Sequence, residues 1–334
     1  MPGRGPAALV AAMAVASSAC ALADRSGAAG PSLPSPALAW LDPDSLRTEL
    51  VGDGVFYHFA WSARGPWAVH LVSADLTRCE LELAVVPAVG EDGVTRTRKT
   101  VTAMAPRGEV TPLAGVNGDF FAPDGSPAGP EVTANTRRSS TRPAIAWDSG
   151  RTPRIGSDTV SGWAGDPAAG LQVVGGFPEL LDSGVRVDDL GVAERPQFAA
   201  VRHPRTAVGY GPRHGLLWLV VVDGRRNARS AGMTLPELTE LLESLGVAEA
   251  LNLDGGGSSA MALGRRLVST PSDVTGERPV GNSLWLVRDG SDCGVAYRAP
   301  GARSHLSDSP RWPPRPGPGS KYRPPKALTT TEEA

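Results

Sequence analysis

Three aspartates, each at the end of an apolar stretch, are the residues of this sequence best suited to chemistry. Asp119 follows the apolar part of "GVNGDFF", Asp223 that of "LVVVDGR" and Asp254 that of "LNLDGGG". A carboxylate is tolerated at a strand end because the end reaches solvent or a cleft, and ligand sites of sheet proteins often gather at that rim. The three aspartates are therefore the predicted catalytic residues.

An asparagine stands two positions before two of these aspartates. Asn117 precedes Asp119, and Asn252 precedes Asp254. Side chains two residues apart point to the same face of an extended strand. Each asparagine is therefore predicted to face the same side as its aspartate.

The last aspartate runs into a loop of small residues, "GGGSS". Gly255, Gly256 and Gly257 have no Cβ, so a ligand can approach their backbone closely. Successive backbone N–H groups can bind an anion, and Ser258 adds a hydroxyl donor. These features predict a loop that binds a phosphate or polyol oxygen, although a glycine run is also typical of a simple tight turn.

One arginine, Arg205 in "RTAVGY", is the predicted phosphate ligand. Its planar guanidinium can bind a phosphate through two parallel hydrogen bonds. The alternative for such an arginine is a surface salt bridge.

One helix, over residues 235–245, must position this region. Thr234 and Glu237 form a capping-box pattern at its start, four leucines form an apolar stripe, and Gly246 ends it. Apolar stretches at 216–222 and 249–253 flank the helix. This order resembles a βαβ crossover, which predicts that the two strands run parallel in one sheet.

Strand signals dominate the rest of the chain. The predicted fold class is α+β, with strand-rich mixed sheets, few helices and a single catalytic domain over residues 55–290. The short apolar segments that predict strands are 80–87, 113–121, 142–147, 171–181, 205–210, 216–224, 249–255 and 282–287.

The composition is that of a folded protein that does not bind nucleic acid. Of 334 residues, 41% are hydrophobic and 20% are charged, which is enough for a sizeable core. The formal net charge is only -2, and no basic stripe interleaved with aromatics occurs in the body of the chain.

The two ends of the chain differ from the body. Residues 1–23 read as a signal peptide, with an apolar run and the cleavage pattern Ala21-Leu22-Ala23. Residues 24–54 are predicted to be a flexible leader, and residues 291–334 a Pro-rich disordered tail. We therefore expect an exported protein, secreted or at the cell surface or periplasmic, with no stable membrane insertion after signal cleavage. A retained anchor and a lipoprotein at Cys20 are the alternatives.

Removal of the signal leaves two cysteines, Cys79 and Cys293. In an oxidising compartment such a pair is predicted to form a disulfide, and two separate buried thiols are the alternative.

Together these motifs resemble the phosphodiester glycosidase family. "LAGVNGDFF", "RTAVGY", "VVVDGR", the leucine-rich helix and "ALNLDGGGSSAM" come in the family's order and approximate spacing, within residues 65–288. The resemblance adds Gly224 and Arg278 to the predicted substrate-binding residues. It also implies that Asn117 and Asn252 position sugar hydroxyls. It implies hydrolysis of the glycosidic bond of a sugar-1-phosphodiester, similar to an N-acetylglucosamine-1-phosphodiester and derived from a cell wall or exopolysaccharide. A sugar-phosphate or glycan is then the expected partner, no cofactor is required, and Asp254 acts as base or nucleophile with Asp223 as its partner.

Two other functions remain open from the sequence. The three aspartates could hold Mg²⁺ or Ca²⁺ for a metal-assisted phosphodiesterase that cleaves the P–O bond. Alternatively, the Asn and Asp side chains could only hydrogen-bond a sugar, in a non-catalytic wall-glycan binding module.

Overall fold

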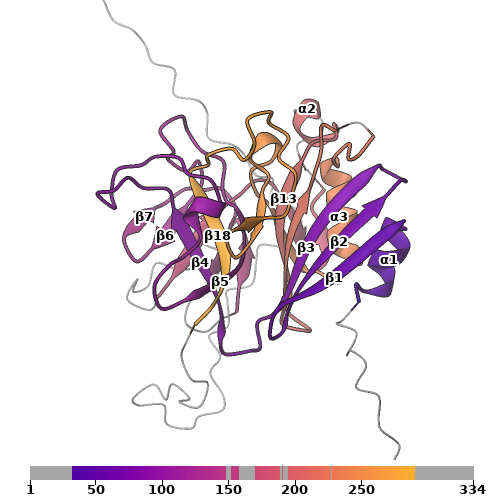
Figure 1. Ribbon diagram of the computed structural model, residues 1–334, viewed down its shortest axis with the longest axis horizontal. Helices are drawn as coiled ribbons and strands as arrows, with labels where there is room; N and C mark the ends of the chain where they lie inside the picture. The colour runs from indigo at the N-terminus through magenta and orange to yellow at the C-terminus, as the bar shows by residue number, and fades with distance from the viewer. Residues whose placement is uncertain are drawn as a thin grey trace, which may run out of the picture. The chain divides into compact units, whose positions relative to one another are not determined.

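The fold is built around an antiparallel sheet of eight strands, shown in Figure 1. The computed structural model describes residues 32–147, 152–157, 170–188, 190, 195–226 and 228–289. In order across the sheet, its strands are β1 (Ser45–Gly52), β2 (Val55–Ser62), β3 (Trp67–Asp75), β14 (Leu216–Val222), β13 (Arg205–Gly211), β15 (Glu249–Asn252), β11 (Glu179–Asp182) and β12 (Val185–Arg186).

Two five-stranded antiparallel sheets complete the strand framework. The first is ordered β7 (Thr136–Arg138), β6 (Glu131–Thr133), β10 (Gln172–Gly175), β8 (Ala144–Trp147) and β9 (Arg154–Gly156). The second is ordered β17 (Arg266–Leu267), β16 (Met261–Leu263), β5 (Thr111–Asn117), β18 (Asn282–Arg288) and β4 (Leu81–Pro87).

The central strands of the large sheet are apolar throughout because both of their faces are buried. In β14, Leu217, Leu219 and Val221 contribute to a core shared with the five-stranded sheets. Trp218 and Val220 point the other way, into a core shared with the helices. This alternation follows from the two-residue period of a strand, and it explains why "LLWLVVV" shows no polar face.

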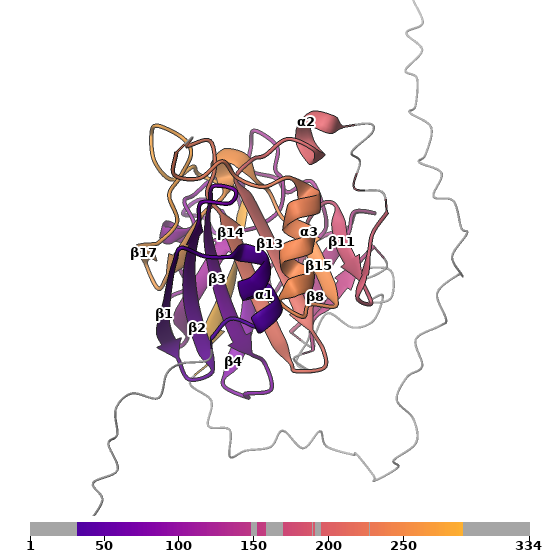
Figure 2. The same ribbon diagram turned by 90° about the vertical axis from the view of Figure 1, so that its right-hand side faces the viewer.

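Two helices cover the outer face of the large sheet. Figure 2 shows α1 (Ser35–Leu41) and α3 (Leu235–Ser244) lying side by side over it. The α3 helix begins as predicted, with a complete capping box between Thr234 and Glu237. A short helix, α2 (Pro196–Ala199), and two 3₁₀ turns, η1 (Thr102–Met104) and η4 (Gly256–Ser258), are the other helical segments of the described residues.

The predicted crossover is confirmed, with one strand inserted. Both β14 and β15 pair with β13 in antiparallel fashion, so these two strands run parallel to each other in one sheet. The β13 strand lies between them, and α3 connects them across the outer face.

The expectation of a strand-rich fold with few helices is confirmed, and the architecture is closer to mostly β than the α+β label implies. The prediction of a single strand over 171–181 is wrong. The extended segment is interrupted at Phe177 and Pro178, and the strands on either side, β10 and β11, belong to different sheets. The predictions also omitted strands β1, β2 and β3, whose mixture of aromatic and polar residues gave a weak apolar signal.

The flexible leader predicted over residues 24–54 is wrong for the part that the structure describes. Residues 35–41 form α1, and residues 45–52 form β1 at the edge of the large sheet. Leu33 and Leu41 are fully buried against the helix-side core, because the Pro- and Ala-rich segment carries apolar residues at positions that face α3.

Several predictions fall outside the described residues. These are the signal peptide over 1–23, the start of the leader over 24–31, and the tail over 291–334. Cys20 and Cys293 lie there as well, so the Cys79–Cys293 disulfide stays a prediction. Among the described residues, no helix combines the length and hydropathy needed to cross a membrane.

Candidate active site

The loop that carries Asp254 follows the end of β15. It contacts the loop that follows β5. The Asp254 amide donates to the Gly118 carbonyl oxygen (3.0 Å), which joins this loop to the one that follows β5. The chain then turns through η4, where Gly256 has a φ of +63°. Glycine adopts that conformation without strain, so Gly256 is needed for the turn itself.

Asn117, at the end of β5, joins the Asp254 loop to its neighbours through hydrogen bonds. The Asn117 Nδ2 donates to the Asp254 carbonyl oxygen (2.6 Å), and its Oδ1 accepts from Thr206 Oγ1 (2.8 Å) and from the Ala260 amide (3.1 Å). Asn117 is fully buried. Its amide group is therefore occupied within the protein, and the prediction that Asn117 binds a sugar hydroxyl is wrong.

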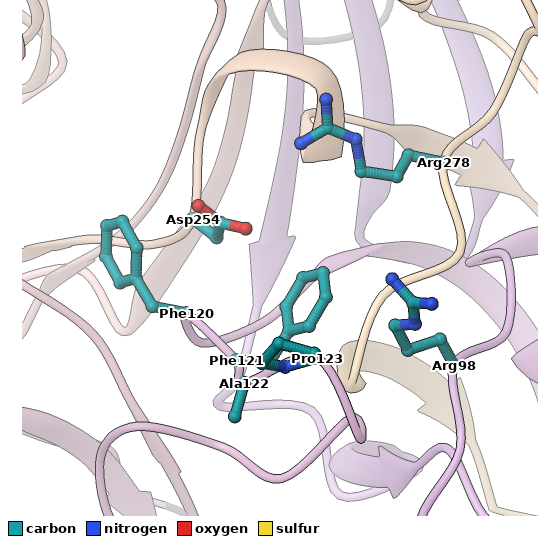
Figure 3. A pocket seen from close by; sticks show the side chains of 7 residues that line it. All are labelled: Arg98, Phe120, Phe121, Ala122, Pro123, Asp254 and Arg278. Carbon is teal, nitrogen blue, oxygen red and sulfur yellow. The ribbon is translucent and has the colours of Figure 1, made fainter.

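A cavity of about 390 Å³ opens in front of the Asp254 side chain. In Figure 3, Phe120 lies on one side of Asp254, while the side chains of Arg98 and Arg278 lie on the other side. The chain segment Phe121–Pro123 completes the lining. An aromatic wall, one carboxylate and two guanidinium groups thus meet in one space, which suits a sugar joined to a phosphate.

Arg278 is held in place by an ion pair and by a glycine. Its Nε lies 2.8 Å from Asp273 Oδ2, and its Nη2 lies 3.1 Å from Asp273 Oδ1. A Cβ at Gly257 would overlap both side chains of this pair. The missing side chain at Gly257 therefore lets Arg278 pack directly on the loop, and the Arg278 side chain remains 41% exposed.

The surroundings of Asp254 make its carboxyl a weaker acid than a solvated aspartate. Burial raises the pKa of the Asp254 carboxyl, while the Ser258 hydroxyl, the Gly255 amide and the charge of Arg278 act in the opposite direction. The Gly255 amide donates to Asp254 Oδ1 (2.9 Å). The Ser258 hydroxyl lies beside the carboxyl without forming a hydrogen bond of ordinary geometry. A carboxylate with a raised pKa is a stronger base than a solvated aspartate.

Asp119 lies behind the pocket. It is 1% exposed, and its carboxylate accepts hydrogen bonds from the Phe120 and Gly129 amides. Burial raises the pKa of Asp119 to about 6; the Asp254 charge also raises it, while Arg142 and the two amides lower it. Since its oxygens are bound by the backbone and it does not line the cavity, Asp119 acts on the site through its charge and through the loop it organises.

The second predicted aspartate of the catalytic pair, Asp223, lines a different cavity. Its Oδ2 lies 3.2 Å from His70 Nε2, and its Oδ1 accepts from the Thr270 amide (2.9 Å). That cavity, of about 190 Å³, has Phe59 and Trp61 on one wall. The structure therefore places Asp223 and Asp254 in the linings of two different cavities, and their pairing in one catalytic centre stays a prediction.

The predicted phosphate ligand Arg205 is buried under the site. Its Nε donates to the Met233 carbonyl oxygen (2.8 Å), and its Nη2 donates to the carbonyl oxygens of Phe198 (2.6 Å) and Val201 (3.1 Å). Burial lowers the pKa of Arg205 to about 10. With 2% exposure, Arg205 anchors loops and does not contact the cavity.

Three other predicted residues, Asn252, Gly224 and Gly255, hold or pack against neighbouring backbone. Asn252 is buried, and its Nδ2 donates to the carbonyl oxygens of Phe177 (2.7 Å) and Leu253 (2.9 Å). A Cβ at Gly224 would overlap the Pro204 backbone, and one at Gly255 would lie 2.9 Å from the Pro204 carbonyl oxygen. These glycines permit close packing of the loops.

The three aspartates do not form a metal-ligand set, because one is bound by backbone amides, one lies in the other cavity and one faces the main cavity. The described residues that do bring three carboxylates together are Glu179, Asp182 and Glu249, and none of them lines either cavity.

Sequence reasoning missed most of the pocket wall. Phe120 and Phe121 follow Asp119 directly in "GDFF", so their proximity to the site could have been inferred from that motif. Arg98 lies in "TRTRKT", which gives no signal beyond its charge, and only the tertiary fold brings it to Asp254.

Comparison with known proteins gives a family. Residues 111–287, just over half of the 334-residue chain, match the model of the family described as phosphodiester glycosidase. The N-acetylglucosamine-1-phosphodiester alpha-N-acetylglucosaminidase of Mus musculus is 44% identical over 77 residues, which are 23% of this chain and 14% of that protein. The Homo sapiens protein of the same name is 43% identical over 77 residues, with the same shares of each chain. The SPbeta prophage-derived uncharacterized protein YomE of Bacillus subtilis is 41% identical over 86 residues, 26% of this chain and 13% of that one.

Solved structures share the fold. A hypothetical protein from Synechocystis superposes with a TM-score of 0.59 at 19% identity, covering 74% of this chain and 64% of that one. The zebrafish N-acetylglucosamine-1-phosphodiester alpha-N-acetylglucosaminidase catalytic domain, auto-inhibited by its pro-peptide, superposes with a TM-score of 0.55 at 22% identity, covering 73% and 84%. The matched family region contains Asp254, the loop after it and Arg278. This chain belongs to the phosphodiester glycosidase family.

Proposed function

We propose that this protein hydrolyses the glycosidic bond of a sugar-1-phosphodiester at the Asp254 cavity. The observation that carries the proposal is the grouping of one carboxylate of raised pKa with two arginines and an aromatic wall in one cavity of about 390 Å³. Family membership supports the same chemistry. The curated relatives named for it are matched over only a small part of their length.

Hydrolysis of a glycosidic bond to phosphate needs little more than this carboxylate and the two arginines. Breaking the bond between the anomeric carbon and the phosphate oxygen builds positive charge on the sugar. Asp254 either takes a proton from the attacking water or bonds to the anomeric carbon before water displaces it. In both routes the electron pair of the C–O bond leaves with the phosphate monoester, and the water oxygen ends on the sugar. Arg98 and Arg278 would stabilise the departing phosphate.

Metal-assisted cleavage of the P–O bond finds less support. A divalent cation prefers several oxygen ligands, and here one carboxylate faces two guanidinium groups. We propose that no metal or other cofactor is required.

The bond that breaks is the direct test. The protein is incubated in ¹⁸O-water with a panel of sugar-1-phosphodiesters, including an N-acetylglucosamine-1-phosphodiester. Label in the released sugar is expected. Label in the phosphate would establish P–O cleavage instead, and binding without any released product would establish a non-catalytic binding module.

The variant Asp254→Asn should lose turnover by at least about a thousandfold, the scale for removal of a group from a cooperating catalytic set. Its melting temperature should change little, because a buried carboxylate of raised pKa contributes little to folding. The matched control is Asp223→Asn, which makes the same chemical change at the aspartate that follows β14 and lines the other cavity. Loss of turnover in Asp223→Asn with near-normal turnover in Asp254→Asn would move the chemistry to the other cavity.

Export is part of the proposal. The apolar segment and cleavage pattern at residues 1–23 support secretion or a cell-surface or periplasmic location, where a wall or exopolysaccharide phosphodiester would be met. A mature N-terminus at Asp24, read by mass spectrometry of the secreted protein, tests it. A lipidated Cys20 at that terminus would replace it with an anchored form.

A further inference from the structure

An aromatic cluster extends the Asp254 cavity on the side away from Arg98 and Arg278. We define it as Phe120, Phe177 and Phe198. Phe120 lines the cavity, its ring centroid lies 6.0 Å from that of Phe198, and Phe198 lies 6.4 Å from Phe177. All three rings are half-buried, so they form a surface that reaches from the cavity outward.

Besides the buried Arg205, whose guanidinium is centred 5.4 Å from the Phe198 ring, two more accessible arginines lie on this surface. The Arg142 guanidinium is centred 5.8 Å from the Phe120 ring and 5.8 Å from the Phe177 ring. The Arg195 guanidinium is centred 5.4 Å from Phe177. Arg142 is half-buried and Arg195 is exposed.

Arg142 differs from the other arginines near the site in its partners. Arg205 uses its N–H groups on three carbonyl oxygens, and Arg278 is bound to Asp273. Within the described part of the chain, no ion pair involves Arg142, although its charge lowers the pKa of Asp119. A guanidinium whose face rests on aromatic rings still presents its N–H groups at its edge, in the geometry that binds a phosphate.

We propose that Arg142 binds a second phosphate of the substrate, across the Phe120 ring from the bond that is cleaved. The inference rests on the proposed function and deepens it. The first phosphate lies between Arg98 and Arg278, Phe120 supports the group that joins the two phosphates, and Arg195 adds positive charge beside the second. The substrate class is therefore a glycosyl phosphodiester with at least two phosphates, as in a polymer of repeating phosphodiester units.

The test separates binding from turnover. Two inert analogues are prepared in which CH₂ replaces the anomeric oxygen. One carries a single phosphorus group, and the other carries two phosphorus groups joined through one repeating unit of the polymer. Their dissociation constants for the wild-type protein are measured by calorimetry. We expect the two-phosphorus analogue to bind at least about tenfold more tightly, the scale of one hydrogen-bonded charged contact, and the advantage to shrink at high salt.

Variants assign the advantage to this surface. Arg142→Ala should bring the ratio of the two dissociation constants close to one, and Arg142→Lys should recover part of it because the charge remains without the planar edge. The control is Arg213→Ala, which removes the same charge from an exposed residue just beyond the end of β13 opposite Arg205. That variant should keep the wild-type ratio.

Equal binding of the two analogues by the wild-type protein would overturn the inference, and so would a ratio that Arg142→Ala leaves unchanged. A ratio that falls equally in Arg213→Ala would show a general effect of net charge and would overturn it too. Because the analogues cannot be hydrolysed, these results do not depend on turnover. Failure of the wild-type protein to hydrolyse any sugar-1-phosphodiester would instead contradict the proposed function.

Discussion

At the residue scale, the acidity of the site depends on what surrounds each carboxylate. Asp254 and Asp119 are both buried and both have a raised pKa, but only Asp254 faces the cavity. Arg278 lowers the pKa of Asp254, and Arg98 lines the same cavity from a distant segment of the chain. The two arginines thus give a matched pair for testing the electrostatics of the site.

We expect Arg278→Gln to move the acidic limb of kcat/KM to higher pH. Asp254 must be ionised to act as base or nucleophile, so activity rises as pH rises through its pKa, and loss of the Arg278 charge raises that pKa further. The measurement is the pH profile of kcat/KM for wild type, Arg278→Gln and Arg98→Gln. An acidic limb that moves equally in both variants would contradict a specific action of Arg278 on Asp254.

Asp119 should make folding stability depend on pH. Its pKa is about 6 in the folded protein and 3.8 ordinarily, so between these values the native state keeps a proton that the unfolded chain has lost. The free energy of unfolding should then fall as pH rises from about 4 to about 6, by about 3 kcal/mol at most.

Urea unfolding of wild type and Asp119→Asn across that range checks this prediction. The variant should be less stable at low pH, because its NH₂ group faces a backbone amide where an oxygen accepted a hydrogen bond, and the difference between the two proteins should narrow toward pH 6. Parallel curves would show that Asp119 titrates as an ordinary aspartate.

At the element scale, the loop between β5 and β6 shapes the pocket wall. It carries Phe120, Phe121 and Pro123, and it packs against the segment that carries Arg98. Gly125 holds this contact: its φ is +91°, and a Cβ there would overlap the Thr97 carbonyl oxygen. The position of two pocket walls therefore depends on one residue that lacks a side chain.

Gly125→Ala should destabilise the protein more than Gly108→Ala. Both glycines have a positive φ, +91° and +99°, so both variants carry a conformational cost of about 1–2 kcal/mol, but no atom lies near a Cβ at Gly108. Gly125→Ala must also displace backbone, which should lower the melting temperature further and raise KM by moving Phe121 and Arg98. Equal melting temperatures and KM values would show that the loop gives way without consequence.

At the scale of the whole molecule, the segment 32–54 belongs to the folded body. The α1 helix covers the outer face of the large sheet beside α3, where Trp40 Nε1 donates to Glu240 Oε2 (3.2 Å). Trp40 also stacks on Trp67 of β3, with ring centroids 5.0 Å apart. The helix-side core would be open without this segment.

Leu41→Ala should cost about 2–5 kcal/mol of unfolding free energy, since Leu41 is 0% exposed in that core. Leu50→Ala, at a position in β1 that is 63% exposed, should change it by about 0.5 kcal/mol or less. Urea unfolding measures both. A small effect of Leu41→Ala would show that α1 rests only loosely on the sheet.

Local sequence determined the parts of this protein that depend on neighbours in the chain. The start of α3 follows from Thr234 and Glu237, the apolar run of β14 from burial on both faces, and the turn after Asp254 from its glycines. Motif order was enough for the family, and the strand-end position was enough to predict that Asp254 faces a cavity.

Only the tertiary structure decided which side chains share a space. Arg205 and Asp223 have the residue types and strand positions of ligands, yet carbonyl oxygens bind the first and a separate cavity holds the second. Arg98 and Arg142 carry no signal in the sequence, and they reach the site through strand pairing and loop packing between segments distant in the chain. The physical reason is that hydrogen-bond partners and cavities form between elements, whereas residue types and spacing report only on the element that contains them.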